Sequence, residues 1–243
     1  LTKSLTLTGV SGELLTTTIK APAVNPVSDI VLVSGAGVDV EITGLTISGP
    51  GAGTTGSLGT GIFVRSGANA NIHHNRVLEI RDSTLSSAQT GTAIQVGSQT
   101  LATTGTATIA YNTLSGYQRS GIAVNLAGSS ATINNNTIVG TGPTSVIAQR
   151  GILVSYGATA NITANTVSAH SYPDAGIGIF LYASSANTSG NTLNENFYGI
   201  YQMGGSGTHD GNILSTTAAG VGASSYYGII ISNDLAVAPM TVT

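Results

Sequence analysis

A short template centred on asparagine recurs along the chain, and it constrains the fold more than any other feature. Its best copy, residues 133–138, reads Ile-Asn-Asn-Asn-Thr-Ile, with one apolar residue three positions before the last asparagine and another two positions after it. The template asparagines are Asn75, Asn112, Asn136, Asn165, Asn191 and Asn212, and an earlier copy carries Leu45 instead. A short unit that returns at intervals of a few tens of residues predicts a solenoid, in which equivalent residues stack from one turn to the next.

A second repeated unit precedes the template and reads Gly-Ile-x-Val or a close variant. Its isoleucines are Ile62, Ile94, Ile122, Ile152, Ile179, Ile200 and Ile229. Apolar residues alternate in short β-branched runs, and no segment has the i, i+3, i+4, i+7 spacing of an amphipathic helix. The sequence therefore predicts an all-β parallel solenoid of about eight to ten rungs. We expect residues 1–243 to form a single domain that is part of a longer chain or assembly.

The asparagine template has a physical explanation at a corner of such a coil. The apolar residues on either side point inward from consecutive strands. We expect the asparagine to lie at the bend between them, because it tolerates left-handed backbone angles better than other non-glycine residues. At the ~4.8 Å spacing of neighbouring strands, its amide can donate to one rung and accept from the next, forming an asparagine ladder. The glycine before each isoleucine is expected to mark a second tight corner, where a Cβ would be costly.

Composition excludes several classes of protein. Only 7% of residues are charged and the net charge is −3, so the chain lacks the basic face that nucleic acids require, and no nucleic-acid partner is expected. No apolar run approaches the ~18 residues that would predict a membrane span. The absence of cysteine excludes disulfides and thiolate metal sites. We expect a secreted or cell-surface protein.

The stretch 3–9, Lys-Ser-Leu-Thr-Leu-Thr-Gly, followed by the two repeated units, resembles right-handed parallel β-helix proteins of the pectate-lyase-like superfamily. More narrowly, the chain is similar to their carbohydrate-binding and sugar-hydrolase repeat domain, over nearly its whole length. The resemblance implies a right-handed coil and a polysaccharide partner. The capping helices usual in that family are missing from both ends, so we expect self-association, or a flanking domain, at the ends of the solenoid.

Candidate functional residues gather in the variable segments between each asparagine template and the next isoleucine strand. Because rungs stack, these loops are expected to lie side by side on one flank. Arginine can bind carboxylates through two hydrogen bonds, and tyrosine offers a flat face to sugar rings, which suits an extended acidic polysaccharide. The candidate ligand-binding residues are Glu79, Arg81, Asp82, Tyr117, Arg119, Arg150, His170, Tyr172 and Asp174. The alternative is that these charges are only solvated or paired with one another.

Two functional hypotheses follow. In the first, the protein is a surface solenoid with a structural, adhesive or polysaccharide-binding role, and it assembles through its uncapped ends. In the second, it is a carbohydrate-active enzyme of the polysaccharide lyase or uronan epimerase type. Arg119 or Arg150 would then neutralise a uronate carboxylate, while Tyr172 or His170 moves a proton. Whether the chain is an enzyme stays open from the sequence.

Motifs of the catalytic subfamilies are largely missing. The chain has neither the Asp-Asp pair nor the Gly-His-Gly segment of the glycosidases of that family, and residues 170–174 carry the epimerase residue types in a different order. No cofactor is expected, and calcium only if the lyase hypothesis holds. No metal site is expected at His73 and His74, because the neighbouring templates carry Ala110 and Asn134 in place of the first histidine.

Overall fold

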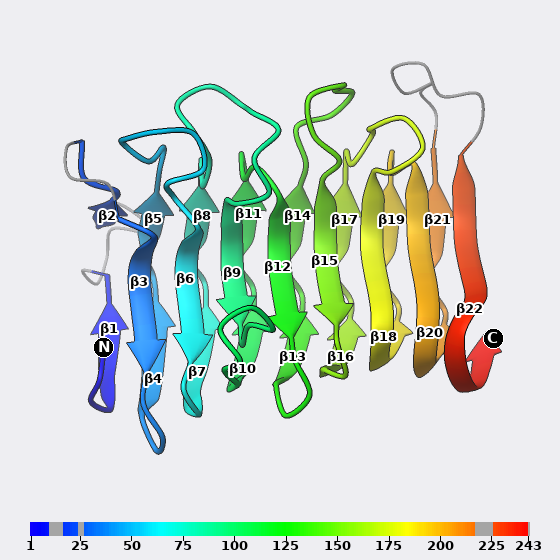
Figure 1. Ribbon diagram of the computed structural model, residues 1–243, viewed down its shortest axis with the longest axis horizontal. Coiled ribbons are helices and arrows are strands. Elements are labelled where there is room, and N and C mark those ends of the chain that lie inside the picture. Colours follow the sequence, from blue (N-terminus) through cyan, green and yellow to red (C-terminus); the bar gives the residue numbers. More distant parts are fainter. Residues whose placement is uncertain (10–16, 24–26, 217–225, 243) are drawn as a thin grey trace.

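The chain winds into one coil whose strands stack along a single axis (Figure 1). The structure, a computed structural model, describes residues 1–9, 17–23, 27–216 and 226–242. In these ranges the structure contains strands and no helix. All pairings between the named strands are parallel. The predicted all-β parallel solenoid is therefore confirmed.

Each turn of the coil, or rung, contributes to three faces. The first face contains β3 (Asp29–Ser34), β6 (Thr60–Arg65), β9 (Thr92–Val96), β12 (Ser120–Asn125) and β15 (Arg150–Ser155). The second contains β1 (Leu5–Thr8), β4 (Asp39–Thr43), β7 (Ala68–His73), β10 (Gly105–Ala110), β13 (Ser130–Asn134) and β16 (Thr159–Thr163). The third contains β2 (Thr18–Lys20), β5 (Thr46–Ser48), β8 (Arg76–Leu78), β11 (Thr113–Ser115), β14 (Thr137–Val139), β17 (Thr166–Ser168), β19 (Thr192–Asn194) and β21 (Ile213–Ser215).

Long strands join the first two faces near the C-terminal end of the coil. β18 (Ile177–Ser189) pairs with β15 through its first half and with β16 through its second half. β20 (Tyr198–Asp210) and β22 (Tyr227–Val242) follow it in the stack. The first two faces thus form one 14-stranded sheet, and the third face forms a separate 8-stranded sheet. The rungs that begin at β3, β6, β9, β12, β15, β18 and β20 are complete, with partial rungs on either side, which agrees with the predicted eight to ten.

Columns of identical or similar apolar residues fill the interior. On the first face, Ile62, Ile94 and Ile122 stand directly beside one another in register, and all three are fully buried. On the third face, Val77, Leu114 and Ile138 form a second such column. Each fully buried side chain of this size stabilises the fold by about 1.5–3 kcal/mol. The core is therefore built rung by rung.

The template asparagines lie in one column at the corner between the second and third faces. The backbone N–H and the Nδ2 of Asn136 both donate to Oδ1 of Asn165, at 2.9 and 3.0 Å. The same Nδ2 donates to the backbone oxygen of Ile109 in the preceding rung, at 2.8 Å. Equivalent bonds run from Asn75 to Asn212, and the N–H of Leu45 donates to Oδ1 of Asn75 at the front end. From Asn75 to Asn191, each amide therefore ties its own rung to both neighbours.

The left-handed backbone angle lies one residue before each asparagine of the ladder, and the prediction that the asparagine itself adopts it is wrong. The residues with positive φ at this corner are Gly44, His74, Tyr111, Asn135, Ala164, Gly190 and Gly211. These positions accept varied side chains. At the ladder position the side chain points inward, where the NH₂ group of an amide donates to both neighbouring rungs and its oxygen accepts from the preceding one. Hydrogen bonding, rather than backbone tolerance, explains the asparagine.

The glycines that precede the isoleucines also differ from the prediction. Gly61, Gly121 and Gly151 lie within strands, and their φ angles are not left-handed. A Cβ would nevertheless be costly. At Gly121 it would lie 2.6 Å from the backbone oxygen of Gly151 and 2.6 Å from Cγ2 of Ile138. The glycine is required by close packing between rungs, and the predicted tight corner is wrong.

Replacement of Asn136 by alanine tests the ladder. The change leaves the carbonyl of Ile109 and donors of Asn112 without their partners, and each buried group left unpaired costs about 1–3 kcal/mol. We expect a clear fall in the urea midpoint. The matched control is Asn135→Ala, because the neighbouring Asn135 is exposed and alanine already occupies the equivalent position at Ala164. Equal midpoints for the two variants would contradict this account of the ladder.

Candidate binding surface

The variable loops lie along one edge of the coil, where the third face leads into the first face of the next rung (Figure 1). In the described residues these loops comprise 49–59, 79–91, 116–119, 140–149, 169–176 and 195–197. They hold eight of the nine candidate residues, and Arg150 begins the strand that follows. The structure divides the candidates into four groups, which differ in burial and in partners.

Tyr117 and His170 form the first group, and they are buried inside the coil. The Tyr117 hydroxyl lies 2.5 Å from Nε2 of His170, and Nδ1 of His170 lies 2.7 Å from Oδ1 of Asn196. Because this Oδ1 only accepts, Nδ1 carries the proton and Nε2 accepts from the tyrosine. Burial lowers the pKa of His170 to about 4, although the hydrogen bond with Asn196 acts in the opposite direction and raises it. Solvent does not reach either side chain, so their burial gives no support to ligand contact or to proton transfer by His170, and both stay predictions.

The side chains of the second group, Glu79, Arg81 and Asp82, bind one another or nearby loop residues. Arg81 forms an ion pair with Glu79, with Nη2 and Oε2 2.5 Å apart. Asp82 accepts hydrogen bonds from the backbone N–H of Gly56, at 2.8 Å, and from the Ser86 hydroxyl. Asp82 thereby joins two neighbouring loops, whereas the ion pair of Arg81 and Glu79 lies within one loop. For this group, the geometry agrees with the alternative interpretation, in which the loop charges pair with one another instead of binding a ligand.

The third group contains Arg119 and Arg150, which we call the arginine pair. Neither guanidinium forms an ion pair with a carboxylate of the described residues. Arg119 donates to the backbone oxygen of Ala148 at 3.5 Å. Arg150 lies over the ring of Phe180, with Cζ 5.1 Å from the ring centroid, and its Nε is buried without a hydrogen-bond partner. The arginine pair therefore lacks a carboxylate partner among the described residues, and an anionic ligand could provide one.

The surroundings of the arginine pair lower the pKa of both guanidinium groups. Burial lowers the pKa of Arg119. Burial, followed by the positive charge of Arg119, lowers the pKa of Arg150 to about 10, and Tyr156 acts in the opposite direction. Both side chains remain cationic at neutral pH. Two half-buried like charges near one another form a site at which a bound anion would relieve repulsion.

A strip of aromatic rings begins beside Arg150 and extends over the outer surface of the last rungs. The aromatic strip contains Tyr156, Phe180, Tyr182, Tyr198, Tyr201 and Tyr227. Neighbouring ring centroids are 5.3 to 6.1 Å apart. Tyr156 and Tyr227 are nearly half exposed, at 47% and 45%. Such a row of flat, partly exposed faces is suited to stacking against sugar rings.

Sequence reasoning missed most of the aromatic strip, although a signal was present. Phe180 and Tyr201 occupy the third position of the Gly-Ile-x-Val unit, directly after a buried isoleucine. Side chains alternate between the two faces of a strand, so this position points outward. The parallel register then places Phe180 beside Tyr201. Alternation along the repeated unit would have found them.

One of the two remaining candidates, Asp174, lies near the aromatic strip. Tyr172 is half-buried and Asp174 is exposed, both in the loop before β18. Burial, followed by the negative charge of Asp174, raises the pKa of Tyr198. Asp174 therefore lies near the strip. Their predicted role in binding stays a prediction.

Two further findings concern metals and membranes. Across the described ranges, no cluster of three or more histidine, aspartate or glutamate side chains is arranged to hold a metal ion. His73 contacts Glu41 at 3.0 Å and His74 at 2.9 Å. The part of the chain that the structure describes contains no helix capable of crossing a membrane.

The stacked parallel strands and the continuous inner core define a parallel β-helix. A family model described as "Right handed beta helix region" matches residues 28–233, so the chain belongs to the right-handed β-helix family. The predicted handedness and family resemblance are thereby confirmed. Among solved structures, the Dettilon tailspike protein is similar at 15% identity and a TM-score of 0.47. The match covers 95% of this chain and 60% of the tailspike chain. No curated protein matches the chain.

The buried His170 should give the stability of the protein a characteristic pH dependence. In the unfolded chain its pKa is near 6.5, whereas in the folded protein it is about 4. Between these values the unfolded state binds the extra proton, so stability falls as pH decreases from about 6.5 to about 4. The full loss is about 3 kcal/mol. Urea midpoints measured across this window should fall more steeply for the natural protein than for His170→Gln.

The comparison isolates His170 because other titrating groups are present in both proteins. His209, whose pKa is also lowered by burial, contributes equally to each curve. If the two curves ran parallel across the window, His170 would not be the neutral buried group described above.

Proposed function

We propose that this protein is an extracellular, non-catalytic polysaccharide-binding β-helix that holds an acidic glycan on the arginine pair and the aromatic strip. The single observation that carries the proposal is the arginine pair. Two half-buried guanidinium groups near one another lack carboxylate partners among the described residues. Unpaired buried charge is costly in a free protein, and a ligand carboxylate or sulfate would provide the missing partner.

The aromatic strip supports the same assignment. Arg150 lies directly over Phe180, and the rings continue through Tyr201 and Tyr198 to the last rung. Aromatic side chains offer a large contact area at low entropic cost, because few bonds must be fixed. A glycan lying along the coil axis could therefore bind through one charged contact and several stacking contacts.

The geometry gives less support to a lyase or epimerase. His170 is buried, and this burial lowers its pKa. The side chain is therefore not placed to exchange a proton with a substrate. Tyr117 is equally buried. A general acid or base must come within hydrogen-bonding reach of the proton that it transfers. Among the predicted proton-transfer residues, Tyr172 alone is partly accessible.

Removal of rings from the aromatic strip tests the proposal. Phe180→Ala combined with Tyr201→Ala should weaken retention on immobilised polygalacturonate or alginate at least tenfold, or about 1.4 kcal/mol, because two stacking faces are lost. The matched control is Tyr111→Ala. Tyr111 is 56% exposed and stacks on His74 at another corner of the coil. An equal loss in the control would indicate that the rings act without a defined site.

Removal of charge from the arginine pair gives a second test. Arg119→Gln combined with Arg150→Gln should abolish the preference for acidic over neutral glycans. It should leave the urea midpoint unchanged or raised, because a repulsive, unpaired contact is removed. Arg76→Gln, at an exposed position on the third face, is the control and should retain the preference. Unaltered binding in the double variant would overturn the proposed site.

An activity assay separates binding from catalysis. Incubation with the same polyuronates, with and without calcium, should yield no ultraviolet absorbance from unsaturated uronate ends. A time-dependent increase that Tyr172→Phe abolishes would instead favour the lyase hypothesis.

A further inference from the structure

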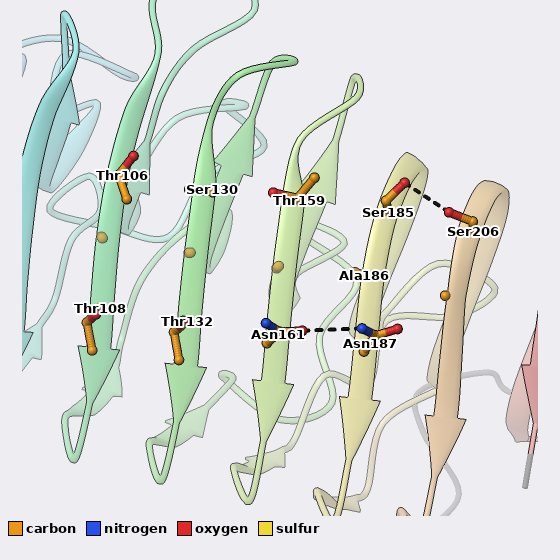
Figure 2. Close-up of a pocket in the computed structure, with 14 residues that line it drawn as sticks. Thr106, Thr108, Ser130, Thr132, Thr159, Asn161, Ser185, Ala186, Asn187 and Ser206 are labelled. Carbon is orange, nitrogen blue, oxygen red and sulfur yellow. Dashed lines mark hydrogen bonds between the residues drawn. The ribbon is translucent and has the colours of Figure 1, made fainter.

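A second hollow lies on the second face, away from the arginine pair and the aromatic strip. This polar groove has a volume of about 490 Å³ and crosses β10, β13, β16, β18 and β20 (Figure 2). Figure 2 shows one row of hydroxyl side chains above a second row of hydroxyl and amide side chains. The first row is Thr106, Ser130, Thr159, Ser185 and Ser206, and the second is Thr108, Thr132, Asn161 and Asn187.

The polar groove stays open because the residues that line it are small. Between the two rows lie Ala107, Ala131, Ala160 and Ala186, which face the core and are buried. Outward positions of an exposed sheet often carry long charged or aromatic side chains. Here, the lining contains no charged or aromatic residue. A surface of uncharged donors and acceptors is therefore left accessible across five successive strands.

The side chains in the polar groove can hydrogen-bond in either sense. Ser185 and Ser206 are joined by their hydroxyls at 2.9 Å, and Nδ2 of Asn187 donates to Oδ1 of Asn161 at 3.3 Å. Hydroxyls can both donate and accept, and amides offer one group of each kind. Sugar hydroxyls have the same dual capacity. The rows repeat at the ~4.8 Å spacing of adjacent strands, which provides one contact row for each rung along an extended chain.

The charge of the surrounding residues indicates which kind of polysaccharide the groove would bind. Toward the N-terminal end the same face carries a separate, smaller hollow of about 400 Å³, which is lined by residues that include Asp39 and Glu41. Neither hollow is lined by lysine or arginine. Carboxylates at one end, with no lining cation, disfavour an anionic chain. We infer that the polar groove binds an uncharged, extended polysaccharide, at a site separate from that of the acidic glycan.

The test uses cellohexaose and mannohexaose, which are uncharged β-1,4-linked oligosaccharides, with binding measured by calorimetry. Thr108→Val combined with Thr132→Val removes two hydroxyls and preserves the branched shape that suits a strand. The loss of two hydrogen bonds should weaken binding about tenfold. The matched control, Thr113→Val with Thr137→Val, changes two exposed threonines of the same rungs on the third face and should bind like the natural protein.

The possible results separate this inference from the proposed function. Binding that falls in the groove variant, and is unchanged by the Phe180 and Tyr201 replacements, supports a second site. The inference is overturned if neither oligosaccharide binds, if the control weakens binding equally, or if only the ring replacements weaken it. It is also overturned if the groove variant changes the oligomeric state by light scattering without changing affinity, because the groove would then contact another copy. Failure of the chain to bind polygalacturonate would leave the groove result standing.

Discussion

The parallel register between successive rungs is the constraint on which the rest of the structure depends. The column of asparagine amides fixes that register, because each Nδ2 donates to the preceding rung as well as to the next asparagine. A slip of one residue would turn every inward side chain of a strand outward. It would also separate Ile109 from Ile133, which face the core side by side. Buried amides and stacked isoleucines therefore enforce the same alignment.

Because the inner column is fixed, the outer surface is free to vary. Outward positions of the first face carry the aromatic strip over β18 to β22, whereas outward positions of the second face carry the small polar residues of the groove. Neither set contributes much to the apolar core. The stacked register nevertheless converts single side chains into continuous rows, so a surface for an extended ligand arises without any change in the fold.

The two surfaces differ in the cost that they impose on the free protein. Arg119 and Arg150 are half-buried, lie near one another and lack carboxylate partners among the described residues, and such an arrangement is destabilising. Functional sites often retain groups that lower stability. The polar groove has no such penalty, because its hydroxyls and amides are exposed or paired with each other. The first surface is thus suited to charge recognition and the second to weaker, repeated hydrogen bonding.

Repetition made the fold predictable from the sequence, whereas the candidate site was predictable only in part. The asparagine and isoleucine units correctly predicted parallel strands and a coil. They did not predict where the loop side chains point. Arg81 pairs with Glu79 within its own loop, whereas Arg119 forms no ion pair with a carboxylate of the described residues. The outward rings of Phe180 and Tyr201 could have been found from strand alternation, because they lie inside the repeated unit.

The sequence alone determined the period, the strand type and the buried columns, since each is a local pattern that every rung repeats. The tertiary structure alone decided which loop residues are accessible. Tyr117 and His170 are 53 residues apart in the chain and lie on different rungs, yet they meet inside the coil. Their burial follows from the path of two irregular loops across the stack. No repeat encodes that path, so no pattern in the sequence could reveal it.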